Sequence, residues 1–233
     1  MSDDARSRSV DRRKFLQTTV AGTAAGIATL AGLDLSTARR LHAQTKRSPD
    51  AALAELLAGN RRFAANQLTS IEHDLKILKE HTADKQEPFA AVLACADSRI
   101  PVELIFDQSI GHIFVTRVAG NVVTPEIIAS LEYGVAVLGV NALLVLGHTN
   151  CGAVKAAMKA DTVPGQISVL YPPLRPAVVQ SGGNLAKAIE VNARMQADLL
   201  RTSSTVIREA VSAKTLKVVS AVYDLATGQV SVS

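Results

Sequence analysis

The sequence predicts an α/β fold with a mostly parallel central sheet of about four strands, a short C-terminal edge strand and flanking helices. Short apolar runs typical of buried strands alternate along the chain with amphipathic segments of helical period. Strands separated by helices require right-handed crossovers, which place the strands parallel and side by side. The 233 residues, 48% of them hydrophobic, suffice for one such domain and exclude an intrinsically disordered chain.

The first half of the expected domain holds two helices and two strands. A helix is expected over residues 48–66, because a proline occupies its first turn and apolar residues then recur with a 3.6-residue period. A second amphipathic stretch covers about residues 71–81. The uninterrupted apolar run 89–94 predicts a buried parallel strand, and residues 113–118 predict another.

The second half continues the same alternation. A helix is expected over residues 124–138, with Thr124 as its N-cap, Pro125 in its first turn and Gly139 as its stop signal. Residues 142–146 predict a third buried strand. The remaining expected elements are a Pro-rich bend at 171–173, helices at about 183–200 and 205–213, a fourth strand at 216–223 and a last short strand at 230–232.

Residues 1–43 contain the three parts of an export signal in their usual order. A basic stretch with Arg12 and Arg13 precedes a mild apolar stretch at 20–33, and Leu41-His42-Ala43 offers a cleavage site. The paired arginines, followed by Phe and Leu, resemble a bacterial twin-arginine signal. We therefore expect residues 1–43 to engage that export machinery and to be removed. This leaves one periplasmic domain of residues 44–233.

The alternative for this segment is an uncleaved amphipathic or membrane-anchoring helix. Asp11 stands where the twin-arginine pattern usually has Ser or Thr. The apolar stretch is diluted by Gly and Thr, whereas a stable span needs about 20 strongly apolar residues. No later run is long and apolar enough either, so no stable membrane span is expected in the mature protein.

The charge distribution argues against nucleic acid as a partner. Most of the formal charge of +4 lies in residues 1–43, which leaves the rest of the chain close to neutral. Aromatic residues make up only 3% of the sequence, so stacking platforms for bases are scarce.

Three residues that can bind a metal follow two of the predicted strands. Cys95 comes after the first strand, and His148 and Cys151 come after the third. The carboxyl ends of parallel strands are where such folds bind ligands, and two thiolates with one imidazole fill three of the four positions around Zn²⁺. A disulfide, an incidental histidine and an inert buried thiol remain alternatives, but Asp97 and Arg99 in the same loop favour the metal.

The segment Cys95-Ala96-Asp97-Ser98-Arg99, taken with His148-Thr149-Asn150-Cys151, resembles the zinc signature of the β-class carbonic anhydrases. Further matches are Phe114-Val115-x-Arg117, Asn121, Ser130-Leu131-Glu132-Tyr133 and Tyr223-Asp224-Leu225-x-Thr227-Gly228. The resemblance implies one Zn²⁺ per subunit on Cys95, His148 and Cys151. It also implies a homodimer or homotetramer and a zinc enzyme that reversibly hydrates carbon dioxide to bicarbonate and a proton.

The resemblance also assigns roles to the residues that follow Cys95. Asp97 is expected to accept a hydrogen bond from the zinc-bound hydroxide and to orient its attack, while Arg99 holds Asp97 by a bidentate pair. A plain surface ion pair is the alternative. Val92 stands where the bicarbonate-regulated branch of the family has Trp. We therefore expect Asp97 to be bound to Arg99.

Four further residues match substrate-binding positions of the family. Gln86 matches a glutamine that donates a hydrogen bond to bicarbonate, and Gly152 matches a glycine whose backbone lies near the substrate. Phe114 and Tyr133 match aromatic residues that line an apolar pocket from the partner subunit. From the residues alone, ordinary core packing is an equal alternative for these two aromatics.

Two other functions remain open from the sequence. A related zinc hydrolase acting on carbonyl sulfide or carbon disulfide would carry identical motifs. A non-enzymatic exported protein, with the two cysteines structural or oxidised, would also use the same residues.

Overall fold

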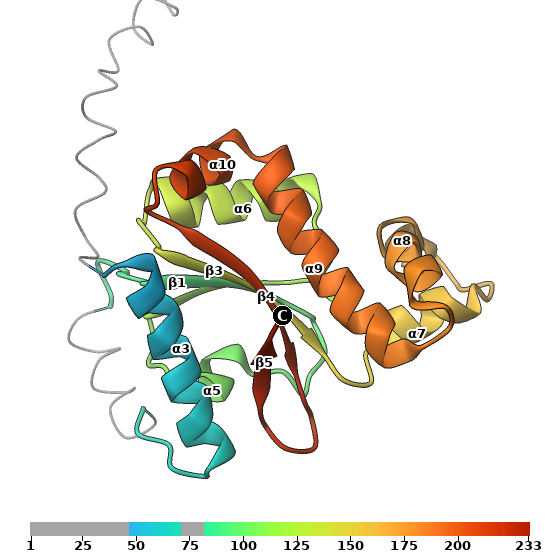
Figure 1. Ribbon diagram of the computed structural model, residues 1–233, viewed down its shortest axis with the longest axis horizontal. Coiled ribbons are helices and arrows are strands. Elements are labelled where there is room, and N and C mark those ends of the chain that lie inside the picture. Colours follow the sequence, from blue (N-terminus) through green and yellow to red (C-terminus); the bar gives the residue numbers. More distant parts are fainter. Residues whose placement is uncertain (1–46, 71–81) are drawn as a thin grey trace, which may run out of the picture. The chain divides into compact units, whose positions relative to one another are not determined.

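The predicted parallel sheet is present in the computed structural model, which describes residues 47–70 and 82–233. Its strand order is β2-β1-β3-β4-β5; the first four strands are parallel and β5 runs antiparallel to β4 (Figure 1). The strands are β1 (Ala90–Ala94), β2 (Ile113–Arg117), β3 (Ala142–His148), β4 (Lys217–Tyr223) and β5 (Val230–Val232). The expected export signal, residues 1–43, and the expected amphipathic stretch, residues 71–81, lie outside the described residues.

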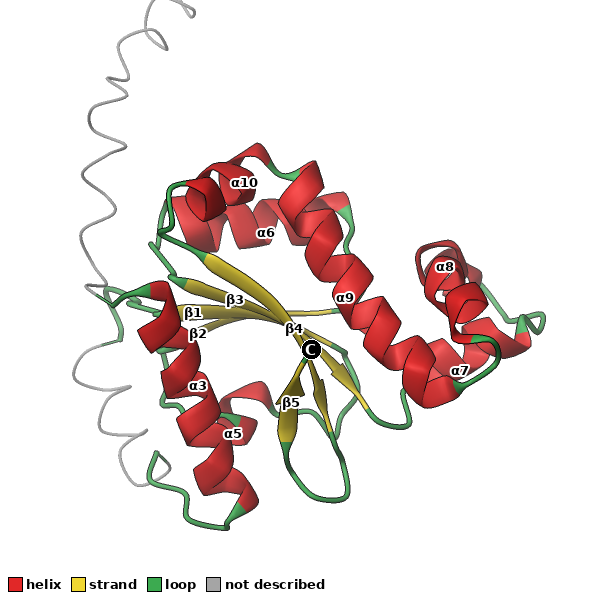
Figure 2. Cartoon of the chain, in the orientation of Figure 1, coloured by secondary structure: helices red, strands yellow, loops and turns green. Residues whose placement is uncertain are grey.

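Helices cover both faces of this sheet, as Figure 2 shows. The α-helices are α3 (Pro49–Ala64), α5 (Val102–Ile105), α6 (Pro125–Ala136), α7 (Gly152–Lys159), α8 (Tyr171–Ser181), α9 (Leu185–Ser203) and α10 (Thr205–Ser212). Within the described residues, short 3₁₀ turns occupy Ala119–Asn121 and Ile167–Leu170. In the described part of the chain, no helix combines the length and the apolar character needed to cross a membrane.

The alternation of side chains along β1 explains this layering. Ala90 and Val92 pack in the core under α3 and α5, whereas Ala91 and Leu93 pack in a second core under α6, α9 and α10. Successive side chains of a strand point to opposite faces, so a strand buried on both faces must be apolar throughout. All five residues of β1 are indeed buried.

One local prediction was wrong, and another was confirmed only in part. Residues 171–173 do not form a bend, because Tyr171 begins helix α8 and a proline in a first turn gives up no intrahelical hydrogen bond. Thr124 is the N-cap residue of α6, as predicted, but its side chain makes no capping bond: its hydroxyl donates to the Glu126 carboxylate at 2.8 Å.

The end of α3 is held beside α5 by the buried carboxylate of Asp107. It accepts hydrogen bonds from Arg62 Nε at 2.5 Å, from the Thr69 hydroxyl at 2.8 Å and from the backbone N–H groups of Thr69 and Ser70 at 2.9 Å. Burial raises the pKa of Asp107, but these donors outweigh it and keep the pKa well below its usual range. The carboxylate therefore stays ionised and keeps α3 in place on its face of the sheet.

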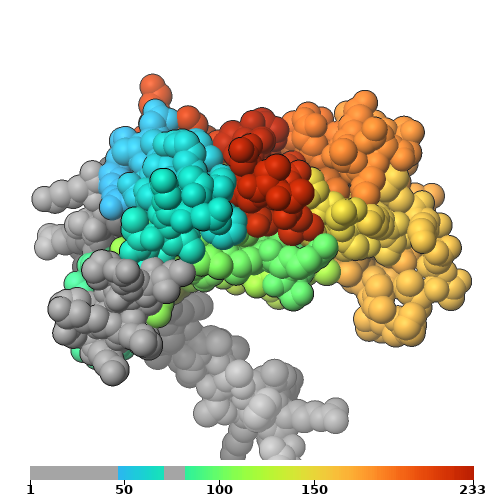
Figure 3. All heavy atoms as spheres, turned by 90° about the horizontal axis from the view of Figure 1, so that it is seen from below, coloured from blue at the N-terminus to red at the C-terminus, as the bar shows by residue number. Residues whose placement is uncertain are grey.

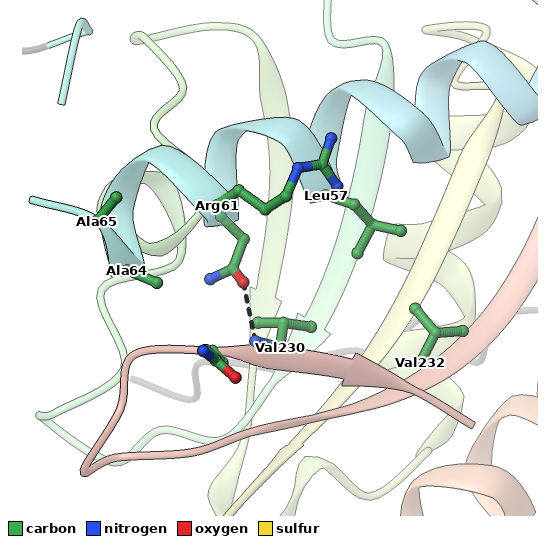
Figure 4. Close-up of a pocket in the computed structure, with 8 residues that line it drawn as sticks. Leu57, Arg61, Ala64, Ala65, Val230 and Val232 are labelled. Carbon is green, nitrogen blue, oxygen red and sulfur yellow. Dashed lines mark hydrogen bonds between the residues drawn. The ribbon is translucent and has the colours of Figure 1, made fainter. Parts of the chain in front are cut away.

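The other side of α3 faces the edge strand β5. On the surface shown in Figure 3, α3 and the C-terminal strands lie side by side. Between them is a cavity of about 600 Å³, lined by residues that include Leu57, Arg61 and Val232. Val230 donates its N–H to the Asn60 side chain at 2.8 Å, the bond drawn in Figure 4. None of the predicted site residues lines this cavity.

Candidate metal centre

The three predicted metal ligands converge at the carboxyl edge of the sheet. Cys95 directly follows β1, His148 is the last residue of β3, and Cys151 directly precedes α7. Strands β1 and β3 are parallel neighbours, so their carboxyl ends lie together. One donor atom from each residue lies within 4.8 Å of the other two, and all three residues are buried. The tertiary structure therefore gathers two thiols and an imidazole at one point.

The state of His148 suits metal binding. Its Nδ1 lies 2.9 Å from the carbonyl oxygen of Thr149, and because a carbonyl only accepts, Nδ1 carries the proton. In the neutral ring Nε2 then presents a lone pair, and among the described residues this buried atom has no hydrogen-bond partner. A zinc-ligating histidine is typically held in this way through its other ring nitrogen. The ring is thus oriented, and its free nitrogen faces two sulfur atoms.

The two cysteines are free thiols in the structure rather than a disulfide. Interaction with Cys151 is the largest influence on Cys95 and lowers its pKa, and the Gly120 N–H contributes in the same direction. The same sharing of one proton between two sulfur atoms raises the pKa of Cys151. The pocket thus stabilises negative charge on sulfur, and a thiolate is the form that binds a metal. Together with the free His148 nitrogen, this donor set fits Zn²⁺ and leaves one tetrahedral position open.

Asp97 and Arg99 form the expected bidentate pair. Arg99 Nε lies 2.9 Å from Asp97 Oδ1, and Arg99 Nη2 lies 2.7 Å from Asp97 Oδ2. The Arg99 backbone N–H adds a third bond to Oδ1 at 3.0 Å. These donors, with the Arg99 side chain first, hold the pKa of Asp97 well below its usual range. Asp97 Oδ2 also lies 3.8 Å from His148 Nε2, so an ionised carboxylate stands beside the metal ligands.

Arg117 holds the backbone of the loop that carries Cys95 and Asp97. Its guanidinium donates to the carbonyl oxygen of Cys95 at 3.0 Å and to that of Asp97 at 2.5 Å. Arg117 ends β2 and pairs with Ala94, the last residue of β1. The register of the two strands therefore brings this side chain to the loop that carries Cys95 and Asp97. The sequence motif marks Arg117 as a match to the family, but only the register shows what it contacts.

The substrate-binding candidates divide into two groups. Gly152 follows Cys151 at the start of α7, and a Cβ added there would meet nothing within 4 Å, so its backbone faces open space near the cluster. Gln86 and Tyr133 instead line a common cavity of about 520 Å³. The Phe114 ring lies 6.2 Å from the Tyr133 ring, measured between centroids.

This second group lies away from the metal ligands of its own chain. Phe114 pairs with Ala91, four residues before Cys95 along β1, which corresponds to about 13 Å at the rise of a strand. Gln86 precedes the amino end of β1, whereas Cys95 follows its carboxyl end. One chain therefore assembles the metal site but leaves Gln86, Phe114 and Tyr133 at the other end of the sheet.

Comparisons with known proteins agree with this geometry. A family model described as carbonic anhydrase matches residues 90–230. Carbonic anhydrase 2 of Mycobacterium tuberculosis is 34% identical over 194 residues, which cover 78% of this chain and 91% of the relative.

Solved structures show the same fold. The β-carbonic anhydrase CafA of Aspergillus fumigatus is 26% identical with a TM-score of 0.64, and the match covers 78% of this chain and 90% of that one. A structure described as a tetrameric β-carbonic anhydrase of Sordaria macrospora is 24% identical with a TM-score of 0.62, over 77% and 95% of the two chains. The chain described here therefore belongs to the β-carbonic anhydrase family.

Proposed function

We propose that this chain catalyses the zinc-dependent, reversible hydration of carbon dioxide to bicarbonate and a proton, with one Zn²⁺ per subunit. The observation that carries the proposal is the buried cluster of Cys95, His148 and Cys151, whose donor atoms lie within 4.8 Å of one another. Beside this cluster stands Asp97, ionised and held by Arg99. A metal site with an open position and an adjacent oriented acceptor is suited to activating water.

Zn²⁺, when bound, supplies the positive charge that makes a water molecule nucleophilic near neutral pH. The protein's own contribution is orientation. Asp97 accepts a hydrogen bond from the attacking oxygen, because its low pKa keeps it an acceptor and Arg99 fixes its direction. A carbon–oxygen bond to carbon dioxide then forms, and the proton of the water is released to solvent. Arg117 holds the loop that carries Asp97, so the acceptor keeps its place during turnover.

We further infer that the complete pocket forms between subunits of a homodimer or of a homotetramer built from such dimers. Gln86, Phe114 and Tyr133 lie together but away from the metal ligands of their own chain. Tyr133 is 48% exposed, and the nearby Val137 is 38% exposed. A second copy of the chain would cover this apolar surface and receive Gln86 and the aromatic rings at its own metal site.

A stopped-flow assay of carbon dioxide hydration tests the proposed activity on protein whose zinc content has been measured. The expected result is hydration in proportion to bound zinc, with one Zn²⁺ per chain. The same zinc-loaded sample, assayed with carbonyl sulfide and carbon disulfide, provides the comparison. If the protein binds stoichiometric zinc and hydrolyses either sulfur compound but does not hydrate carbon dioxide, its activity is that of the related hydrolases. No zinc and no free thiols would favour the non-enzymatic alternative.

We also propose that residues 1–43 direct export by the twin-arginine route to the periplasm of a bacterium. The support is the order of basic, apolar and cleavage segments in the sequence. Export of an already folded protein suits this site, because reduced thiolates can take up zinc in the cytoplasm before they meet an oxidising compartment. The mass of the chain recovered from the periplasm should match a start at Gln44. A full-length chain found only in the cytoplasm would contradict export.

A further inference from the structure

The loop that follows β2 reaches the metal cluster through one backbone group. Gly120 donates its N–H to Cys95 Sγ at 3.3 Å, in a buried position. Gly120 has φ of +75°, and a Cβ there would come within 3.2 Å of Leu174 and 3.3 Å of Ala153. The positive φ favours glycine, and an added side chain would also press against these two neighbours. A hydrogen bond to a ligating sulfur withdraws negative charge from it and so affects how the sulfur binds a metal.

Two buried amides on α9 hold the same loop from the other side. Asn192 Nδ2 donates to the carbonyl oxygen of Gly120 at 2.9 Å, and Gln196 Oε1 accepts the N–H of Val123 at 2.8 Å. Gln196 Nε2 also donates to Asn192 Oδ1 at 3.1 Å, which links the two side chains. They are four residues apart and thus lie on one face of the helix. Only 1% of Asn192 and 3% of Gln196 are exposed.

Gly120 connects these amides to the metal cluster. Its carbonyl group is fixed by Asn192 and its N–H group points at Cys95, so the amide and the sulfur are joined through a single residue. We propose that Asn192, supported by Gln196, is a positioning residue of the metal centre that keeps the Gly120 N–H on the Cys95 sulfur. The inference rests on the proposed zinc site.

The variant Asn192→Leu tests this role, because leucine has a similar size but cannot donate to Gly120. We expect its affinity for Zn²⁺, measured by competition with a chromophoric chelator, to fall by about 10- to 100-fold, as for other partners of metal ligands. In protein loaded with Co²⁺ in place of Zn²⁺, the sulfur-to-cobalt charge-transfer band should move to longer wavelength. The reason is that a sulfur without its N–H donor holds its electrons less tightly.

The matched control is Asn60→Leu. Asn60 is 4% exposed and hydrogen-bonded to Ile105, Gly228 and Val230, but it contacts no metal ligand. This control should lower the urea midpoint of unfolding while leaving the zinc affinity and the cobalt band unchanged. If Asn192→Leu does not fold, Gln196→Met replaces it. We expect Gln196→Met to lower the zinc affinity and to shift the cobalt band in the same directions, but by smaller amounts.

The outcomes separate this inference from the proposed function. Wild-type protein that takes up no Zn²⁺ would refute both. Wild type that binds Zn²⁺ tightly, together with a folded variant whose zinc affinity stays within twofold and whose cobalt band does not move, would refute only the role of Asn192 and Gln196.

Discussion

Asp97→Ala is expected to keep one Zn²⁺ per chain and to lower kcat/KM for carbon dioxide hydration by about 100-fold or more. Asp97 contributes no donor atom to the cluster of Cys95, His148 and Cys151, so its removal leaves the metal ligands in place. What is lost is an ionised acceptor whose Oδ2 lies 3.8 Å from His148 Nε2. Zinc content by atomic emission and stopped-flow hydration on the same sample measure the two effects together.

The control for this prediction is Asp198→Ala. Asp198 is also paired with an arginine, Arg201, at 2.5 Å, but on an exposed part of α9, and exposed ion pairs contribute little. Its removal should leave zinc content and hydration at the wild-type level. Full activity in Asp97→Ala would show that Asp97 and Arg99 are only another surface pair. Loss of zinc in that variant would show that Asp97 acts on the metal rather than on the attacking oxygen.

Mixed oligomers of one inactive variant and one strongly impaired variant are expected to recover activity. Cys151→Ser removes a zinc ligand, and Gln86→Leu removes a donor to bicarbonate, a loss of about 10- to 100-fold in activity for a hydrogen bond to a charged group. In a mixed dimer, the intact metal site of the Gln86→Leu chain receives Gln86 from the Cys151→Ser chain. Random pairing should therefore restore roughly a quarter of the wild-type activity, because half the dimers are mixed and each has one complete site.

A second mixture provides the control for this experiment. Cys151→Ser combined with Asp97→Ala should recover nothing, because Asp97 and Cys151 belong to the metal site of the same chain and no pairing restores both. Recovery in neither mixture, with mixed dimers verified by mass spectrometry, would place Gln86 at the site of its own chain or outside the pocket. Equal recovery in both mixtures would contradict the division of the site between subunits.

The three residues of the candidate metal site and the sheet could be predicted from the sequence, because the signals for both are local. An apolar run such as 89–94 predicts a strand that is buried on both faces, and Cys95 follows this run directly. His148 and Cys151 are three residues apart at the end of another such run. The topology rule for parallel sheets then brings the two strand ends together, and the structure confirms that they meet.

The side chains and backbone groups that surround these three residues can be seen only in the tertiary structure. Asn192 is 72 residues away from Gly120, and Gly120 is 25 residues away from Cys95, so no periodicity or spacing connects them. Gln86 lies at the opposite end of β1 from Cys95, and this placement likewise depends on the direction in which β1 runs through the sheet. Short sequence patterns report which backbone conformation and which face a residue prefers. A buried polar atom must find a hydrogen-bond partner, and the partner often comes from a distant part of the chain. The packing of the helices on the sheet determines which group that is, and this packing exists only once the whole chain has folded.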